Sequence, residues 1–288
     1  MVNSINYRHY FHTLYSQYSS QTFLSSDPIE FCYRYEDPKD IEVIAFISAL
    51  FAYGNVVAIK KFLESLLSLL TNSPFSFIKR GDFGIVESKV SAYRFQTRKD
   101  IVLFLNTLSM VLNQYNSLEP IFNIESKNEN KLNIKIVNFQ KYFLKQINLI
   151  LGNKKISYGL QFLIGSGKLN SAHKRYCMFL RWMVRDSFPD FGLYKSIRKE
   201  DLIYPTDVHI VRLASILGIS NRKTVDFKLA ESITQYFSDI TKEDPLLYDF
   251  PLSRIGILKF CRAKYKKDVC EVCELKKLCK VYKAAKLY

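Results

Sequence analysis

Four cysteines lie close together near the C-terminal end of the chain, in a segment rich in lysine. They are Cys261, Cys270, Cys273 and Cys279, and their spacing is C-x8-C-x2-C-x5-C. Clustered thiols in a chain without signs of secretion are more typical of a metal site than of disulfides. Four thiolates suit either tetrahedral zinc or a 4Fe-4S cluster, and their spacing alone does not decide between the two.

A second group of residues with chemical potential lies between Gly165 and Leu213. It begins with GSGKLNSAHKR, a turn of small and polar residues that leads into the apolar stretch YCMFLRWMV. Small residues before the first turn of a helix leave backbone N–H groups open, and such groups attract phosphate. Lys168, Lys174 and Arg175 supply positive charge at this entrance.

The same segment ends in TDVHIVRL, which starts at Thr206. Pro205 and Thr206 suit the start of a helix, and Asp207 follows them directly. A carboxylate in this position usually caps the helix, because it accepts hydrogen bonds from the first backbone N–H groups. On the residues alone, Asp207 is therefore interpreted as a helix cap.

This last run resembles the V-D-x-H-I/V/M-x-R-V/L signature of the helix-hairpin-helix DNA glycosylases, the endonuclease III superfamily. In that family a Gly-rich hairpin with a lysine precedes the signature, and a C-x6-C-x2-C-x5-C iron-sulfur loop closes the chain. The cysteine segment here is similar, with its first gap two residues longer. The stretch from Phe46 to Leu66 resembles the early helix pair of the family. Together the similar parts cover about residues 40–70 and 160–285.

Within the superfamily the chain looks most like a bacterial branch with the pattern S-A-x-K-R followed by F-L-R-W-M-V-R. Both parts are present, starting at Ser171 and at Phe179. The hairpin sequence L-P-G-x-G-x-K is absent, and Lys174 lies 33 residues before Asp207. Most relatives have a shorter interval, whereas the archaeal 8-oxoguanine glycosylases have a comparably wide one. A second alignment, in which Lys168 takes the place of Lys174, matches the hairpin better and the following helix worse.

The resemblance implies a role for each candidate residue. Lys174 would be the nucleophile, and Asp207 would stabilise the cationic sugar and accept a proton. Asn55 would enter the gap that a flipped base leaves, while Lys168, Ser171 and Arg175 would contact DNA. The four cysteines would hold a 4Fe-4S cluster rather than zinc. A lysine that only contacts phosphate, and an Asn55 that only joins two helices, remain the alternatives.

The elements that must position these residues are helices. Residues Ile41 to Tyr53 are apolar almost all round, which is typical of a helix in the centre of a bundle, and Asp37-Pro38 marks its start. Apolar residues recur with helical spacing from Ile59 to Leu70 and from Lys99 to Leu112. Strand-like alternation is weak everywhere. For Tyr93-Arg94-Phe95-Gln96, a buried Tyr/Phe pair is a simpler interpretation than a base-stacking residue.

Composition and charge narrow the function further. Of 288 residues, 48% are hydrophobic, including 19 Tyr and 22 Phe, which excludes a disordered chain. Lys and Arg number 42 against 27 Asp and Glu, so the net charge is +15. Such an excess favours an anionic partner, and nucleic acid first. No apolar run is long enough for a membrane span, and the first residues do not resemble a signal peptide, so we expect a cytoplasmic, nucleoid-associated monomer.

The sequence thus predicts an all-α protein with the two-lobed helix-hairpin-helix glycosylase fold and a four-cysteine cluster loop. The predicted lobes are residues 38–185, and residues 1–37 together with 186–288. The predicted function is base-excision repair: a DNA glycosylase with AP-lyase activity that removes a damaged base from double-stranded DNA. The alternative from another class is a non-catalytic nucleic-acid-binding protein whose tail is held together by zinc.

Overall fold

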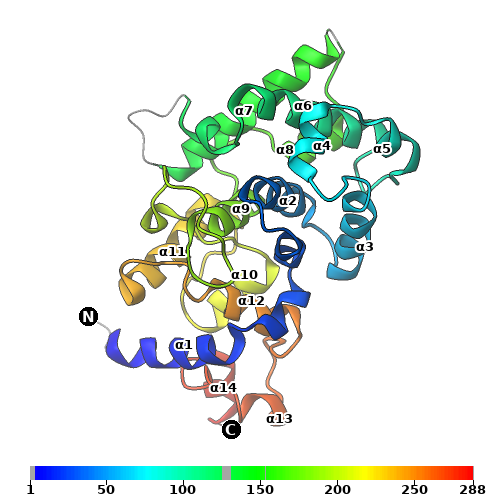
Figure 1. The fold of residues 1–288 in the computed structure, drawn as a ribbon. Coiled ribbons are helices and arrows are strands. Elements are labelled where there is room, and N and C mark those ends of the chain that lie inside the picture. The colour runs from blue at the N-terminus through cyan, green and yellow to red at the C-terminus, as the bar shows by residue number, and fades with distance from the viewer. Residues whose placement is uncertain (1–3, 125–130, 153, 288) are drawn as a thin grey trace. The chain divides into compact units, whose positions relative to one another are not determined.

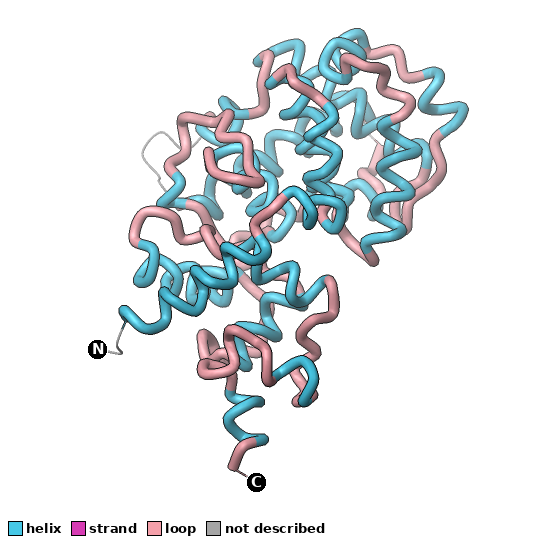
Figure 2. Tube along the Cα trace, turned by 60° about the horizontal axis from the view of Figure 1, so that its bottom comes forward, coloured by secondary structure: helices cyan, strands magenta, loops and turns pink. Residues whose placement is uncertain are grey.

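The computed structural model describes residues 4–124, 131–152 and 154–287 (Figure 1). Its regular structure is helical, and Figure 2 draws no strand among these residues. One isolated bridge between Tyr93 and Gln96 is the β-type pairing found in the described ranges. The predicted all-α class is confirmed.

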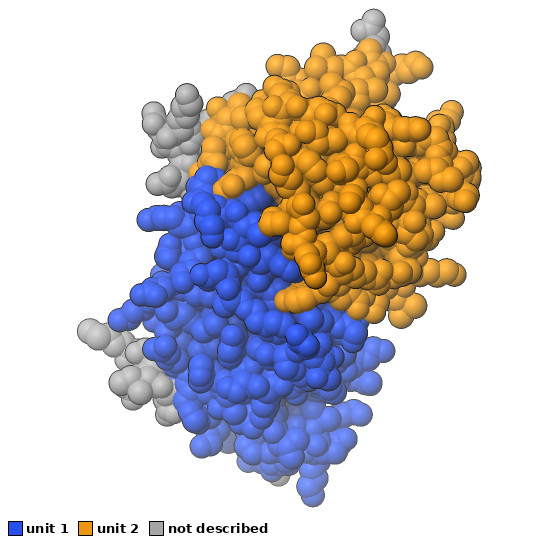
Figure 3. All heavy atoms as spheres, in the orientation of Figure 1, with its two compact units in different colours: residues 1–27, 170–288 blue, residues 28–169 orange. Residues whose placement is uncertain are grey.

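The chain forms two compact units, which Figure 3 shows in different colours. The split unit combines Met1–Asp27 with Asn170–Tyr288, and the continuous unit is Pro28–Leu169. These boundaries differ from those of the predicted lobes, 38–185 and 1–37 with 186–288. As a result α9 (Lys174–Val184) lies in the split unit, together with Asp207 and the four-cysteine tail.

The continuous unit is built around α2 (Pro38–Phe51), which is buried from Asp40 to Phe51. Its other helices, in chain order, are η2 (Pro28–Arg34), α3 (Val56–Leu67), α4 (Pro74–Arg80), α5 (Gly84–Lys89), α6 (Arg98–Tyr115), η3 (Glu119–Asn123), α7 (Leu132–Leu151) and α8 (Tyr158–Ile164). As the sequence predicts, Asp37 caps α2 through the N–H of Lys39, and Pro38 occupies its first turn. Neighbouring helices surround α2, so it has no face that is exposed to water from Asp40 to Phe51.

Aromatic rings and two buried carboxylates fix α2 among its neighbours. The ring of Phe46 lies 6.0 Å from that of Phe104 on α6 and 5.6 Å from that of Phe139 on α7. Asp40 accepts a hydrogen bond from the N–H of Phe75 in α4, and the carboxylate of Glu42 accepts one from the N–H of Leu118. Buried polar groups are tolerated here because each has a partner.

The split unit begins with α1 (Ser4–Tyr18) and η1 (Gln21–Ser26). Its remaining helices are α9, η4 (Lys199–Asp201), α10 (Val208–Ile216), α11 (Phe227–Thr241), α12 (Asp249–Ile257), α13 (Lys267–Cys270) and α14 (Lys280–Ala285). Helix α1 packs against α11 and α12, and its Phe11 ring lies 5.2 Å from that of Phe237. Gln17 of α1 also donates a hydrogen bond to Glu274 in the cysteine tail. Helix α1 therefore helps to hold the cysteine tail in place.

Arg181 near the end of α9 and Arg185 directly after it are buried inside the split unit, where neither side chain is more than 3% exposed. Arg181 bonds Asp190 through Nε at 3.1 Å and Asp249 through Nη1 at 2.5 Å. Arg185 is paired with Asp190 and, at 2.9 Å, with Asp244. The five members of this buried ion cluster come from the end of α9, the loop after it, the segment between α11 and α12, and the start of α12, so the cluster joins these four parts of the chain.

The loop between α9 and α10 folds back along α9. The N–H groups of Phe191 and Tyr194 donate to the carbonyls of Trp182 and Met183 near the end of that helix. Further on, the N–H of Tyr204 donates to Thr234 of α11 at 2.9 Å. These bonds determine where the start of α10 lies.

The length and hydropathy of the helices bear on whether they could cross a membrane. None of those within the described residues has both the length and the apolar character that a bilayer span requires.

Replacing Arg181 with methionine should lower the free energy of unfolding by about 3–5 kcal/mol, because Asp190 and Asp249 would stay buried without their shared partner. Arg198→Met is the matched control, since Arg198 pairs with Asp201 at the surface and its side chain is 68% exposed. That variant should unfold almost like the wild type. Urea denaturation followed by circular dichroism measures both, and equal losses would contradict a special role for the buried cluster.

Candidate functional site

Asp207 caps α10, as the residues alone suggest. Its Oδ1 accepts hydrogen bonds from the N–H groups of His209 and Ile210, each at 2.8 Å. Its Oδ2 accepts none within the described ranges, and the residue is only half-buried. One oxygen thus holds the carboxylate in place while the other is left for a further group.

A second carboxyl lies near Asp207. Asp249, at the start of α12, is 3% exposed and bonded to Arg181. Burial raises the pKa of Asp249 to about 6, against the lowering effect of Arg181, and the charge of Asp207 adds to the rise. The candidate site therefore borders directly on the buried ion cluster, which links it to α9.

Helices α10 and α12 approach each other very closely at Gly256. A Cβ atom at this position would lie 2.5 Å from the Cβ of His209. Only a glycine permits this distance, which brings the first turn of α10 against α12. His209 is thereby placed as a packing residue beneath Asp207.

Lys174 is the first residue of α9 and is half-buried. The residue before it, His173, has a left-handed backbone with φ 47° and is 6% exposed. Arg175 is likewise half-buried, and Ser171 is exposed in the preceding turn. Lys174, Arg175, Ser171 and Asp207 all belong to the split unit.

Lys168 and Asn55 belong to the other, continuous unit. Lys168 is exposed near the end of that unit. Asn55 is exposed and caps α3, since its Oδ1 accepts a hydrogen bond from the N–H of Ala58 at 2.8 Å. The two alternative lysines are thus in different units, and Asn55 has the helix-junction role in addition to any contact with DNA.

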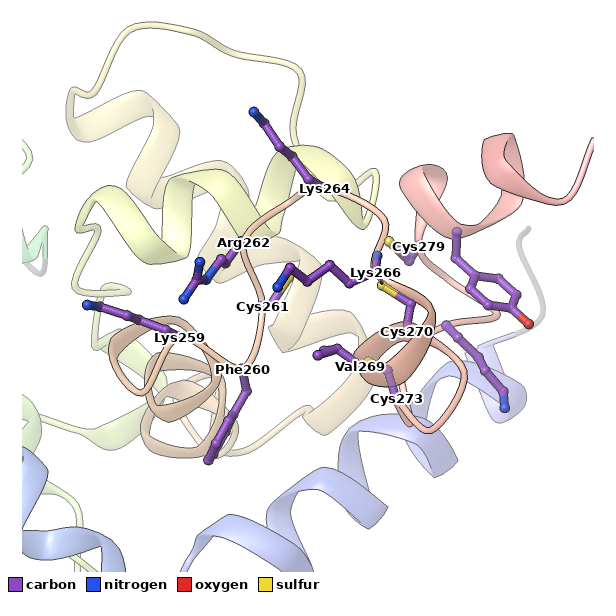
Figure 4. Close-up of a pocket in the computed structure, with 12 residues that line it drawn as sticks. Lys259, Phe260, Cys261, Arg262, Lys264, Lys266, Val269, Cys270, Cys273 and Cys279 are labelled. Carbon is purple, nitrogen blue, oxygen red and sulfur yellow. Dashed lines mark hydrogen bonds between the residues drawn. The ribbon is translucent and has the colours of Figure 1, made fainter. Parts of the chain in front are cut away.

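The four cysteines line one pocket of about 180 Å³ (Figure 4). Cys261 follows α12, Cys270 ends α13, Cys273 follows it and Cys279 caps α14. Burial raises the pKa of Cys273 to about 11, and the other three thiols add to the rise because they are close. Within the residues that the structure describes, no three Cys, His, Asp or Glu side chains are arranged to hold a metal ion.

The surroundings of the pocket suit a negatively charged centre. The N–H of Lys266 donates to the sulfur of Cys270 at 3.4 Å, and backbone N–H groups also bond Cys261 and Cys273. The pocket is lined by the cationic residues Lys259, Arg262, Lys264, Lys266 and Lys276. Hydrogen bonds to sulfur and nearby cations stabilise thiolates, which are the form that binds metal. These surroundings would favour thiolates over thiols, and metal binding to the four cysteines would release their protons.

The sequence interpretation missed the acidic partners of the buried ion cluster. Asp190, Asp244 and Asp249 lie 5 to 68 residues from the arginines that bind them. The available signal was Arg181 and Arg185, two charges four residues apart at the end of the apolar stretch that begins at Tyr176. Such a pair must find buried carboxylates, although the sequence does not say which ones.

The described residues form an all-helical protein in two units. One unit contains both the carboxylate that caps α10 and the four-thiol pocket. Residues 27–258 match the family described as Protein of unknown function (DUF2400), so the chain belongs to that family. The matched range includes Lys174 and Asp207 and ends before the four cysteines. Neither a curated protein nor a solved structure matches the chain.

Gly256→Ala should lower the melting temperature, because the added methyl group collides with His209 and separates α10 from α12. Overpacking of this kind costs about 1–3 kcal/mol, which exceeds the helix-propensity gain of about 1 kcal/mol. Gly84→Ala is the control, since its Cβ would meet Asp82 only at an ordinary 3.6 Å. Differential scanning calorimetry compares the two. A stabilised Gly256→Ala variant would show that α10 and α12 can separate at no cost.

Proposed function

We propose that this protein is a DNA glycosylase that removes a damaged base from duplex DNA and then cleaves the strand as an AP lyase. The observation that carries the proposal is Asp207: one oxygen is fixed by α10 and the other is uncommitted at a half-exposed position. The run around Asp207 resembles the glycosylase signature, and Lys174 belongs to the same unit. The net charge of +15 suits a DNA partner.

The proposed chemistry begins with base flipping. A base inside a duplex is out of reach, so it must rotate into a pocket at an unstacking cost of roughly a few kcal/mol. Asn55 occupies the vacated space, while Ser171, Arg175 and Lys168 contact the phosphates. Breaking the bond between the base and C1′ builds positive charge on the sugar, which the carboxylate of Asp207 stabilises.

Lys174 then acts as the nucleophile. Its neutral amine forms a bond to C1′ while the base leaves with the bonding electron pair, and Asp207 accepts the proton that the amine loses. Opening of the sugar ring gives a Schiff base, and removal of a C2′ proton expels the 3′ phosphate. If water replaces the amine, the reaction stops at the abasic site.

The four cysteines would hold a 4Fe-4S cluster in this proposal. When bound, the cluster supplies a structural cross-link for the tail, because four thiolates from three short segments share one centre. Lys266 and its neighbours around the pocket then face the DNA phosphates as a cationic surface. No step of base removal passes through the cluster.

One observation favours a different function. Asn55 and Asp207 both act as helix caps, a role that needs no catalysis. The second candidate is therefore a nucleic-acid-binding protein without catalytic activity, in which the same thiols bind zinc. Chemical trapping and metal analysis distinguish the two candidates.

Borohydride should trap a covalent complex between the protein and an abasic duplex, because it reduces the Schiff base of Lys174. Lys174→Gln should abolish trapping and leave duplex binding nearly unchanged, since glutamine removes the amine and keeps a polar side chain of similar size. Asp207→Asn should fold normally and lose base removal in a screen of lesion-bearing duplexes, with at least about a 100-fold lower rate. Gel electrophoresis measures each product.

The comparison variant is Lys168→Gln, which should still form the trapped complex and lose only the contact of this lysine with phosphate. If it fails to trap while Lys174→Gln succeeds, the mechanism stands and the lysine has been misidentified. Base removal without trapping in any variant would mean that water is the nucleophile. Full activity of Asp207→Asn would exclude this site as a glycosylase centre.

Protein purified without added metal should be brown and contain about four iron atoms per chain, as a 4Fe-4S cluster requires. Cys273→Ser should lose the iron and the colour, because one of the four ligands is gone. Cys32→Ala, which removes a fully buried thiol far from the tail in sequence, should keep both. Colourless wild-type protein with one zinc per chain would support the second candidate instead.

A further inference from the structure

A strained two-residue turn lies at the surface of the continuous unit. Tyr93 and Gln96 exchange both backbone hydrogen bonds, at 2.9 and 2.8 Å, and Arg94 and Phe95 form the turn between them. Arg94 has φ 51°, a left-handed conformation that normally selects glycine. A large cation in this position costs about 1 kcal/mol of backbone strain, and such strain is often found at functional sites.

Buried hydrogen bonds hold this turn rigidly. The hydroxyl of Tyr93 donates to the carbonyl of Tyr53 at 2.7 Å, and the hydroxyl of Tyr53 donates to the side chain of Gln96. The Gln96 amide donates in turn to the carbonyl of Gly159 in α8 at 2.7 Å. The turn is thereby attached both to the end of α2 and to the start of α8.

The turn and α8 expose aromatic rings side by side. Phe95 is 42% exposed and Tyr158 is 68% exposed, and their rings meet edge to face at 5.7 Å and 84°. Behind them the ring of Phe162 lies 4.7 Å from that of Phe95, and Tyr53 lies parallel to Phe95 at 6.4 Å. The two rings meet at nearly right angles, and both are exposed enough for a flat ligand to reach them.

Arg94 lies beside this corner. Its guanidinium is 5.7 Å from the ring centre of Phe95 and 5.8 Å from that of Tyr53. A Cβ atom at Gly54 would lie 2.8 Å from Nη1 of Arg94, so this side chain also touches the junction that precedes Asn55. Among the described residues Arg94 pairs with no carboxylate, which leaves its charge for an anionic partner.

We infer that Arg94, Phe95 and Tyr158 form a stacking platform for a nucleobase of an unpaired DNA strand. The exposed rings offer π faces to the base, and the uncompensated guanidinium offers a charge to the neighbouring phosphate. A purely apolar partner would leave the Arg94 charge without compensation. A nucleotide offers a base to the aromatic rings and a phosphate to the guanidinium. The inference rests on the proposed DNA binding and is independent of the chemistry at Lys174 and Asp207.

The test compares two labelled single strands of about 15 nucleotides, one of thymidines and one of abasic spacers with the same charge. Fluorescence polarisation at fixed salt should show tighter binding of the strand that carries bases. Phe95→Ala and Tyr158→Ala should each weaken the binding of that strand at least about 5-fold and leave the abasic strand nearly unaffected. Phe95→Trp should restore the wild-type preference, since it keeps a π face.

Two further variants complete the design. Arg94→Ala should weaken both strands and lower the salt slope by about 0.7, the value for one phosphate contact on a single strand. Tyr33→Ala is the matched control, because Tyr33 belongs to the same unit and is 40% exposed. It should bind both strands like the wild type.

The outcomes separate this inference from the proposed function. If the wild type binds the two strands equally, or binds neither, the stacking platform is overturned. Equal binding would mean that the exposed rings bind a protein partner instead. If borohydride trapping persists in that case, the glycosylase proposal stands alone. If the preference depends on Phe95 while trapping fails, the platform stands and the glycosylase proposal fails.

Discussion

The charges of Arg181 and Arg185 are the constraint on which the split unit depends. Moving a charge out of water costs several kcal/mol, and the cost is offset only when opposite charges and hydrogen bonds meet it with good geometry. The end of α9 can therefore be buried only if the two arginines form ion pairs with Asp190, Asp244 and Asp249. In doing so they bring the loop after α9 and the start of α12 to fixed positions. The position of Asp207 follows, because it caps the helix that this loop leads into and that packs on α12.

Elements that obey local rules could be predicted from the sequence. The largely apolar run after Asp37-Pro38 forms the central helix α2, with the predicted cap and start. Asp207 caps α10 for the same local reason, since a carboxylate before a helix finds free N–H groups within its own first turn. The four cysteines line one pocket, as their clustering indicates. In each case the interacting residues belong to one short segment of the chain, so the local sequence pattern is enough to predict the interaction.

Contacts between distant residues could not be predicted in this way. Arg181 and Asp249 are 68 residues apart, and no local pattern selects that carboxylate among the other acids. The division into units shows the same limit, because it falls within the turn before α9 and not after that helix. The turn at Arg94 was interpreted as a buried Tyr/Phe pair, and this is correct for Tyr93 at 5% exposure but wrong for the exposed Phe95. The left-handed backbone of Arg94 lies between the two aromatic residues, and the residue types of this run do not signal that conformation.

Capping and catalysis by Asp207 are compatible because they use different oxygens. A carboxylate that stabilises a cation must be held still, since any reorientation during the reaction would cost part of the electrostatic gain. The N–H groups of His209 and Ile210 hold Oδ1 and thereby fix the direction of Oδ2. Asp249, which lies near Asp207, is itself bonded to Arg181, so the buried ion cluster supplies a positive charge close to this pair of carboxylates.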